Sequence, residues 1–191
     1  MEIKKENAIA AYNAADENTK KALLLLLPEL EEAVKPKDIT ERVKTFEDAV
    51  EILGEEHPFV CAYYCIEDID ECNNDIAAFL KLRIVCAALN EGWEPQFTEG
   101  EERWFPWFTL WTEEELSEKS DEWKADRHLI STGDYSGDYA GLAYADSFNS
   151  SSDTPASIGF RLCLKSEALA TYCGKQFIEL WADFNLIRKQ S

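Results

Sequence analysis

The spacing of apolar residues predicts two long helices in the first half of the chain. Apolar side chains recur three and four positions apart over residues 38–53, and Gly54 follows where a helix C-cap is expected. Over residues 74–90 they cover much of a helix circumference, which indicates a helix buried on most sides, and Asn90 and Gly92 supply its stop. The first half is therefore expected to be helical.

The second half is richer in turn residues and in candidate strands. The expected elements are an edge strand over 103–111, a helix over 113–124 capped by Thr112, strands over 129–131, 142–148 and 157–164, and an amphipathic helix over 166–186 capped by Ser166. The strands 142–148 and 157–164 are expected to pair as a hairpin through the polar connector 149–155. Three glycines make residues 133–141 a turn-rich loop.

Together these elements predict an α+β fold with a helical N-terminal half, a small antiparallel sheet and a closing C-terminal amphipathic helix. A chain of 191 residues with 46% hydrophobic positions has enough apolar surface to close a core. No change in composition marks a boundary, so residues 1–191 are expected to form a single domain. Within it, residues 1–37 could form a peripheral helical arm.

The charge balance is strongly acidic. The chain has 19 basic and 38 acidic residues and a formal net charge of −19. Direct binding to nucleic acid or to an anionic membrane is not expected, because both need Lys and Arg at the contact surface. A partner protein with a basic surface fits this charge, and simple solubility is the alternative explanation. Residues 93–128, with 4 basic and 11 acidic groups, are the most acidic segment for their length.

No targeting or membrane-spanning segment is expected. The N-terminus lacks the apolar stretch of a signal peptide, and the longest aliphatic run, residues 22–27, is far too short for a span. A cytoplasmic location with reduced cysteines is therefore predicted. The glycine-rich motifs that bind phosphate groups are absent, and no cofactor is predicted.

Catalytic and metal chemistry has little support in the sequence. His57 and His128 stand in no nucleophile motif, so both are interpreted as surface or capping histidines, and a non-enzymatic protein is favoured. His57, Cys61 and Cys65 are spaced by four, with Cys72 seven further on, and such nitrogen and sulfur ligands could hold zinc. The spacing is not that of a standard zinc knuckle, so no metal is predicted and these residues stay weak candidates.

Aromatic residues are concentrated between residues 93 and 111. This cluster consists of Trp93, Phe97, Trp104, Phe105, Trp107, Phe108 and Trp111. Burial in the core is the first interpretation, and a groove whose rings and nearby carboxylates bind a cationic partner is the second. The candidate residues for binding a ligand or partner are Trp93, Arg103, Trp104, Trp107, Arg161, Lys165 and Tyr172.

Long sequence motifs suggest a family. They comprise residues 38–49, residues 89–97 continuing into 103–108, residues 159–166 and residues 169–178. Together they resemble a family of small acidic proteins from gut Bacteroidales genomes and their phages or other mobile elements, over residues 38–184. That family has no established activity, so the resemblance assigns no catalytic residue. The loop 133–141 and residues 149–155 have no counterpart in the family's fixed patterns.

Two functional classes are favoured over a third, a hydrolase or metalloprotein that would use His57 and the cysteines. The first is a non-enzymatic interaction protein, whose phage or mobile-element setting implies a host partner, for example a nucleic-acid-binding factor that the acidic chain inhibits. The second is a small-molecule-binding protein that uses the aromatic cluster for a nucleotide-like or cationic ligand. A contiguous acidic face favours the first class. A preformed pocket lined by Trp104, Trp107 and Tyr172 favours the second.

Overall fold

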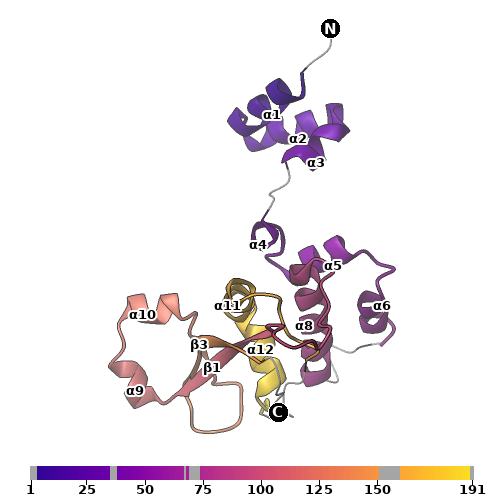
Figure 1. Ribbon diagram of the computed structural model, residues 1–191. Coiled ribbons are helices and arrows are strands. Elements are labelled where there is room, and N and C mark those ends of the chain that lie inside the picture. Colours follow the sequence, from indigo (N-terminus) through magenta and orange to yellow (C-terminus); the bar gives the residue numbers. More distant parts are fainter. Residues whose placement is uncertain (1–3, 35–37, 67, 69–73, 151–159, 190–191) are drawn as a thin grey trace. The chain divides into compact units, whose positions relative to one another are not determined.

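Helices and one small antiparallel sheet make up the chain, which confirms the predicted α+β class (Figure 1). This computed structural model describes residues 4–34, 38–66, 68, 74–150 and 160–189. The chain divides into two units, Met1–Arg42 and Val43–Ser191. No described helix is both long and apolar enough to cross a membrane.

The unit Met1–Arg42 consists of short helices. They are α1 (Lys5–Ala14), α2 (Glu17–Leu26), the 3₁₀ helix η1 (Pro28–Leu30), α3 (Glu31–Val34) and α4 (Ile39–Arg42). Asp16 caps α2 by accepting a hydrogen bond from the Thr19 N–H at 2.8 Å. Leu30 is buried, and α1, α2 and α3 each contact η1.

The unit Val43–Ser191 contains the sheet and the longest helix. Its helices are α5 (Phe46–Leu53), α6 (Pro58–Tyr64), α8 (Asn74–Asn90), α9 (Glu113–Ser117), α10 (Asp121–Asp126), α11 (Glu167–Gln176) and α12 (Ile178–Asn185). Its strands are β1 (Trp104–Trp111), β2 (Ile130–Ser131) and β3 (Gly141–Asn149).

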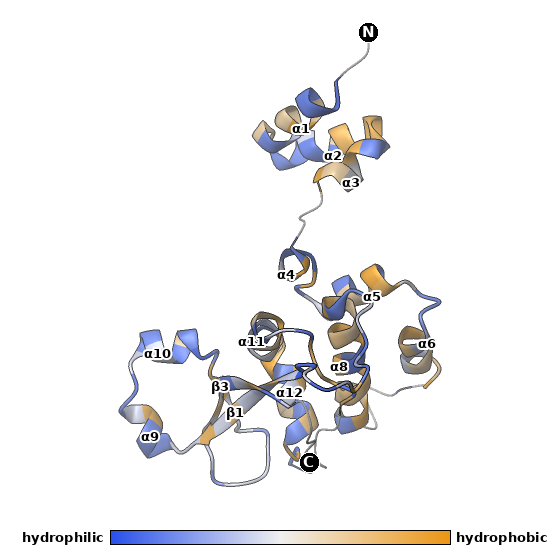
Figure 2. Cartoon of the chain, viewed as in Figure 1, coloured by the Kyte–Doolittle hydropathy of each residue, from blue (hydrophilic) through white to orange (hydrophobic). Residues whose placement is uncertain are grey.

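The core of this unit forms around α8, whose position agrees with the prediction. The helices α5, α6 and α12 pack against α8, and α11 packs against β1 and β3. Leu82, Ile84, Val85 and Leu89 are completely buried, as expected for a helix that is apolar on most sides. Figure 2 shows the contrast with α10, which is largely hydrophilic.

The sheet has the strand order β1-β3-β2, with both pairs antiparallel. The strand β1 lies at the edge, as predicted from Pro106, and its register shifts between Trp107 and Phe108. The predicted hairpin between 142–148 and 157–164 is wrong, because β3 pairs with β1 and β2. Of the described residues 160–164, only Leu164 joins the sheet, through an isolated bridge to Trp104. Residues 151–159 lie outside the described residues.

Three predicted helices are each divided in two. Residues 38–53 form α4 and α5, residues 113–124 fall in α9 and α10, and residues 166–186 contain α11 and α12. A second cap explains the first two breaks. Thr45 and Asp48 form a capping box that starts α5, and the Ser120 hydroxyl accepts from the Trp123 N–H to start α10. Phe177, with φ −112° and ψ 30°, separates α11 from α12. The caps Thr112 and Ser166 are confirmed.

Candidate functional site

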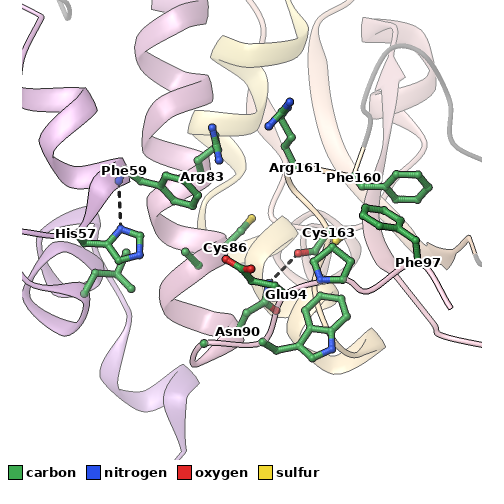
Figure 3. A pocket seen from close by; sticks show the side chains of 15 residues that line it. His57, Phe59, Arg83, Cys86, Asn90, Glu94, Phe97, Phe160, Arg161 and Cys163 are labelled. Carbon is green, nitrogen blue, oxygen red and sulfur yellow. Dashed lines mark hydrogen bonds between the residues drawn. The ribbon is translucent and has the colours of Figure 1, made fainter.

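A pocket of about 640 Å³ lies within the unit Val43–Ser191 (Figure 3). Side chains from the end of α5, from the start of α6 and its N-cap, from α8 and from the segments 92–97 and 160–163 line it. The lining residues are Leu53, His57, Phe59, Arg83, Cys86, Ala87, Asn90, Gly92, Trp93, Glu94, Pro95, Phe97, Phe160, Arg161 and Cys163. The volume is in the range of small-molecule sites, and aromatic rings with a few polar groups are their usual lining.

The start of α6 forms one wall. His57 is the N-cap, and its Nδ1 accepts a hydrogen bond from the Phe59 N–H at 3.2 Å, while Pro58 occupies the first helical turn. A neutral imidazole that accepts at Nδ1 carries its hydrogen on Nε2, so His57 keeps one donor available. The predicted capping role of His57 is confirmed.

Arg83 projects from α8 beside Phe59. Its guanidinium carbon lies 3.8 Å from the centre of the Phe59 ring, close enough for a cation–π contact. Its Nε is buried and has no hydrogen-bond partner among the residues that the structure describes. Burial and, to a smaller extent, the positive charge of Arg161 lower the pKa of Arg83. A buried guanidinium donor without a partner is costly, and a ligand could supply the missing acceptor.

Arg161 reaches the pocket from the segment 160–165, which Asn90 holds against the end of α8. The Asn90 side chain is buried; its Nδ2 donates to the Cys163 carbonyl at 2.9 Å, and its Oδ1 accepts from the Lys165 N–H at 3.0 Å. The Cys86 thiol adds a weaker bond to the Leu162 carbonyl. These side-chain bonds occupy the Leu162 and Cys163 carbonyls and the Lys165 N–H, which in a strand would bond to a neighbouring strand. The segment 160–163 therefore forms no strand.

The opposite wall consists of aromatic rings. Phe97 and Phe160 meet edge to face with their centroids 5.0 Å apart. Arg103 lies beneath them, with its guanidinium carbon 5.3 Å and 4.7 Å from the two ring centres. Arg103 is 2% exposed and pairs with Glu101 at 2.7 Å. It therefore supports the aromatic wall from behind and is not among the lining residues.

Glu101 closes the loop that carries Phe97. Its carboxylate accepts hydrogen bonds from the Gln96 and Phe97 N–H groups and from Arg103. These bonds, led by the one from Gln96, lower the pKa of Glu101. Phe97 has a positive φ of 57°, so the loop needs this support to hold the ring in place.

The thiols of the pocket are poorly suited to nucleophilic chemistry. Burial raises the pKa of Cys163 to about 11. A hydrogen bond with Cys173, together with burial, raises the pKa of Cys86 well above its usual value. Because the thiolate is the reactive form of cysteine, Cys86 and Cys163 stay protonated and unreactive at neutral pH. Cys86 and Cys163 therefore line the pocket as inert side chains.

The residues predicted to bind a ligand are distributed over several places. Trp93 and Arg161 line the pocket. The indole N–H of Trp104 donates to Glu102 at 3.0 Å, and Trp107 is 53% exposed on β1. The Tyr172 hydroxyl donates to the Val43 carbonyl at 2.8 Å, and Lys165 pairs with Glu91 at 2.9 Å. The aromatic cluster is thus divided between the core, the sheet edge and the pocket.

The weak zinc candidates do not assemble in the described part of the chain. His57 caps α6, whereas Cys61 and Cys65 are exposed and the Cys61 thiol donates to the Glu55 carbonyl at 3.2 Å. No group of three or more His, Cys, Asp or Glu side chains that could hold a metal occurs among the described residues. Cys72 lies outside them.

Sequence reasoning missed two central residues of the pocket. Arg83 and Asn90 lie on the predicted helix 74–90, among residues that were expected to be core. The available signal was a single arginine between Leu82 and Ile84, which are both fully buried. A charge inside such an apolar run indicates either a buried ion pair or a functional group.

Comparison of the chain with protein-family models, with curated proteins and with solved structures found no match.

Proposed function

We propose that this protein binds a small molecule in the pocket between α6, α8 and the segments 92–97 and 160–163. One observation supports the proposal most: polar groups that the fold does not use converge there among aromatic rings. The Arg83 Nε has no partner, and the Arg161 side chain has no ion pair among the described residues. A buried donor without a described partner and an exposed guanidinium, placed together among aromatic rings, are typical of a ligand site.

Binding is favoured over catalysis for a chemical reason. The two thiols that line the pocket are held protonated, and the Nδ1 of His57 is engaged in capping α6. Nucleophilic catalysis needs an activated nucleophile within hydrogen-bond reach of a base, and these groups do not supply such a pair.

A ligand screen with a filled-pocket variant tests the proposal. Ala87 lines the pocket from α8, so Ala87→Phe places a ring inside it, whereas Ala125→Phe adds the same ring at an exposed position on α10. Compounds that raise the melting temperature of the parent protein are expected to stabilise Ala125→Phe equally and Ala87→Phe not at all. Ligands that stabilise all three proteins alike would contradict the proposal.

A second candidate function rests on the charge of α9 and α10. Exposed carboxylates gather there: Glu113, Glu114, Glu115, Glu118, Asp121, Glu122 and Asp126. The nearby Lys119 ammonium lies 4.8 Å from the centre of the Trp111 ring and 5.5 Å from that of Trp123. This concentration of exposed negative charge supports an interaction protein, of the phage or mobile-element type, that binds a basic host protein.

The interaction function is tested by charge removal. The variant Glu113→Gln, Glu114→Gln, Glu118→Gln and Glu122→Gln removes four exposed charges, and Glu6→Gln, Glu17→Gln, Glu41→Gln and Glu51→Gln is the matched control. A basic partner is expected to bind the parent and the control at low salt and to bind the α9–α10 variant much more weakly. It is expected to dissociate from the parent and the control at about 1 M salt, where the Debye length is ~3 Å. Equal binding by both variants would contradict this function.

A further inference from the structure

The arginine pair in the pocket indicates which chemical class the ligand belongs to. We propose that the pocket takes an oxyanion attached to a planar ring, that is, an aromatic phosphate or carboxylate, with the oxyanion between Arg83 and Arg161. This inference rests on the proposed small-molecule binding and adds the identity of the charged group. The sequence leaves a nucleotide-like ligand and a cationic ligand open. The inference favours the nucleotide-like ligand, because its phosphate is an anion.

The first argument is that two like charges face the same space. Figure 3 shows the guanidinium groups of Arg83 and Arg161 at the same edge of the pocket, on side chains from α8 and from the segment 160–165. The two groups are close enough for the charge of Arg161 to disfavour ionisation of Arg83. Arg83 is half-buried and Arg161 is exposed, so the repulsion between their charges is only partly screened by solvent, and a bound anion would relieve it.

The second argument concerns their counter-charges. Neither Arg83 nor Arg161 forms an ion pair with any described carboxylate, although the whole chain carries 38 acidic residues. Glu94 is the one carboxylate among the described lining residues, and it too forms no ion pair with them. In so acidic a protein, two arginines in one pocket that pair with no described carboxylate point to a role other than folding.

The third argument is the geometry of Arg83. Its guanidinium carbon lies 3.8 Å from the centre of the Phe59 ring, and this contact restrains the group. A planar guanidinium presents its edge as a fork of N–H donors, which matches the two oxygens of a carboxylate or phosphate. The buried Nε without a partner belongs to that fork.

The fourth argument concerns the remainder of the ligand. The Phe97 and Phe160 rings form the wall away from His57, and Trp93 and Pro95 also line the pocket (Figure 3). Aromatic walls favour a flat apolar group, because stacked or edge-to-face rings attract each other beyond simple burial. A cationic ligand would meet the rings and the Glu94 carboxylate but also both guanidinium groups, so two positive charges oppose it and one negative charge favours it.

Four probes with the same ring separate these possibilities by isothermal titration calorimetry. They are 1-naphthyl phosphate, 1-naphthoate, 1-naphthalenemethanol and 1-naphthylmethylamine. We expect one or both anions to bind at least about tenfold more tightly than the alcohol, and the amine to bind most weakly. The two anionic arms show whether the site prefers phosphate or carboxylate.

Variants test whether the preference for anionic probes depends on Arg83 and Arg161. Arg161 is exposed, so Arg161→Gln is expected to fold; it should lower the affinity for the anions about tenfold while the melting temperature of the free protein stays constant or rises. Arg83→Lys keeps the charge but loses the fork, and should also weaken anion binding. Arg42→Gln, in the unit Met1–Arg42, is the matched control and should bind like the parent.

The outcomes distinguish the inference from the function on which it rests. If the alcohol or the amine binds as tightly as the anions, or if Arg161→Gln leaves anion affinity unchanged, the arginine pair does not select the ligand and the inference is overturned. The small-molecule function then stands. If none of the four probes binds, the inference is overturned, and the proposed function is contradicted as well only if every stabilising ligand from the screen acts alike on the parent, Ala125→Phe and Ala87→Phe.

Discussion

At the scale of single residues, one amide determines much of the candidate site. Asn90 is buried at the end of α8 and satisfies a carbonyl and an N–H in the segment that carries Arg161. Residues of this kind cannot be identified from sequence, because Asn90 and Cys163 are distant in the chain and Asn is also the expected residue at a helix end. The sequence predicted that the helix ends at Asn90. It did not predict that the Asn90 side chain bonds to Cys163 and Lys165.

Replacing Asn90 tests this role. Asn90→Ala leaves the Cys163 carbonyl and the Lys165 N–H without partners, so we expect the free energy of unfolding in urea to fall by about 2–3 kcal/mol. Asn149→Ala, at an exposed position on β3, is the control and should change it by less than about 0.5 kcal/mol. Equal losses in both variants would show that Asn90 has no special role.

Tyr135 gives the protein an alkaline stability limit. Its buried hydroxyl donates to Asp183 at 2.7 Å, and burial, with this bond, raises the pKa of Tyr135 to about 12. Because the folded state holds the phenol proton more tightly than the unfolded state, the stabilisation is complete below about pH 10 and is lost as the pH rises through about 12.

Unfolding at several pH values measures this effect. The difference in unfolding free energy between the parent and Tyr135→Phe should be constant below about pH 10 and should shrink between about 10 and 12. Tyr139→Phe, at an exposed position, provides the comparison and should show no such change. A Tyr135→Phe difference that is independent of pH over this range would contradict the assignment.

At the scale of elements, the sequence indicates where helices start better than where they are interrupted. Thr112, Ser166 and Gly54 are correctly identified as caps because each has a local hydrogen-bonding or backbone role. The breaks before Phe46 and at Phe177 were missed, because apolar spacing continues across both. The capping box of Thr45 and Asp48 is readable from sequence, but it competes with that spacing.

The contact of α11 with the sheet depends on Gly174. A methyl group added there would lie 2.6 Å from the Pro106 Cβ and 2.9 Å from the Tyr144 ring. We therefore expect Gly174→Ala to destabilise the protein by about 1–3 kcal/mol through overpacking, despite the better helix propensity of alanine. Gly133→Ala has an ordinary 3.5 Å contact and serves as the control in the same unfolding experiment. A stabilised Gly174→Ala variant would show that α11 can move away from the sheet.

At the scale of the whole molecule, charge and pocket point in different directions. The net charge of −19 predicts a basic partner, whereas the pocket contains two arginines that pair with no carboxylate in the described part of the chain. The sequence revealed the overall charge because charge is additive along the chain. It could not reveal the pocket, because Arg83, Trp93 and Arg161 meet only after folding. Of the predicted binding residues, Trp93 and Arg161 are the two that line it.

The excess negative charge also predicts a response to salt. Self-repulsion among 38 acidic groups is screened as the Debye length falls from ~30 Å at about 0.01 M to ~10 Å at about 0.1 M salt. The melting temperature is therefore expected to rise by about 2–4 °C over this range, which corresponds to about 1 kcal/mol. A fall in melting temperature would mean that ion pairs such as Arg103–Glu101 dominate instead.

The most direct test of the central claim is to observe the pocket while a ligand binds. Trp93 lines the pocket, whereas Trp123 lies on α10 and contacts Trp111. In ¹⁵N–¹H spectra, with peaks assigned through Trp93→Phe and Trp123→Phe, a ligand that stabilises the protein should shift the Trp93 indole signal and leave that of Trp123 in place. Shifts at Trp123 with none at Trp93 would contradict a binding site between α6 and α8.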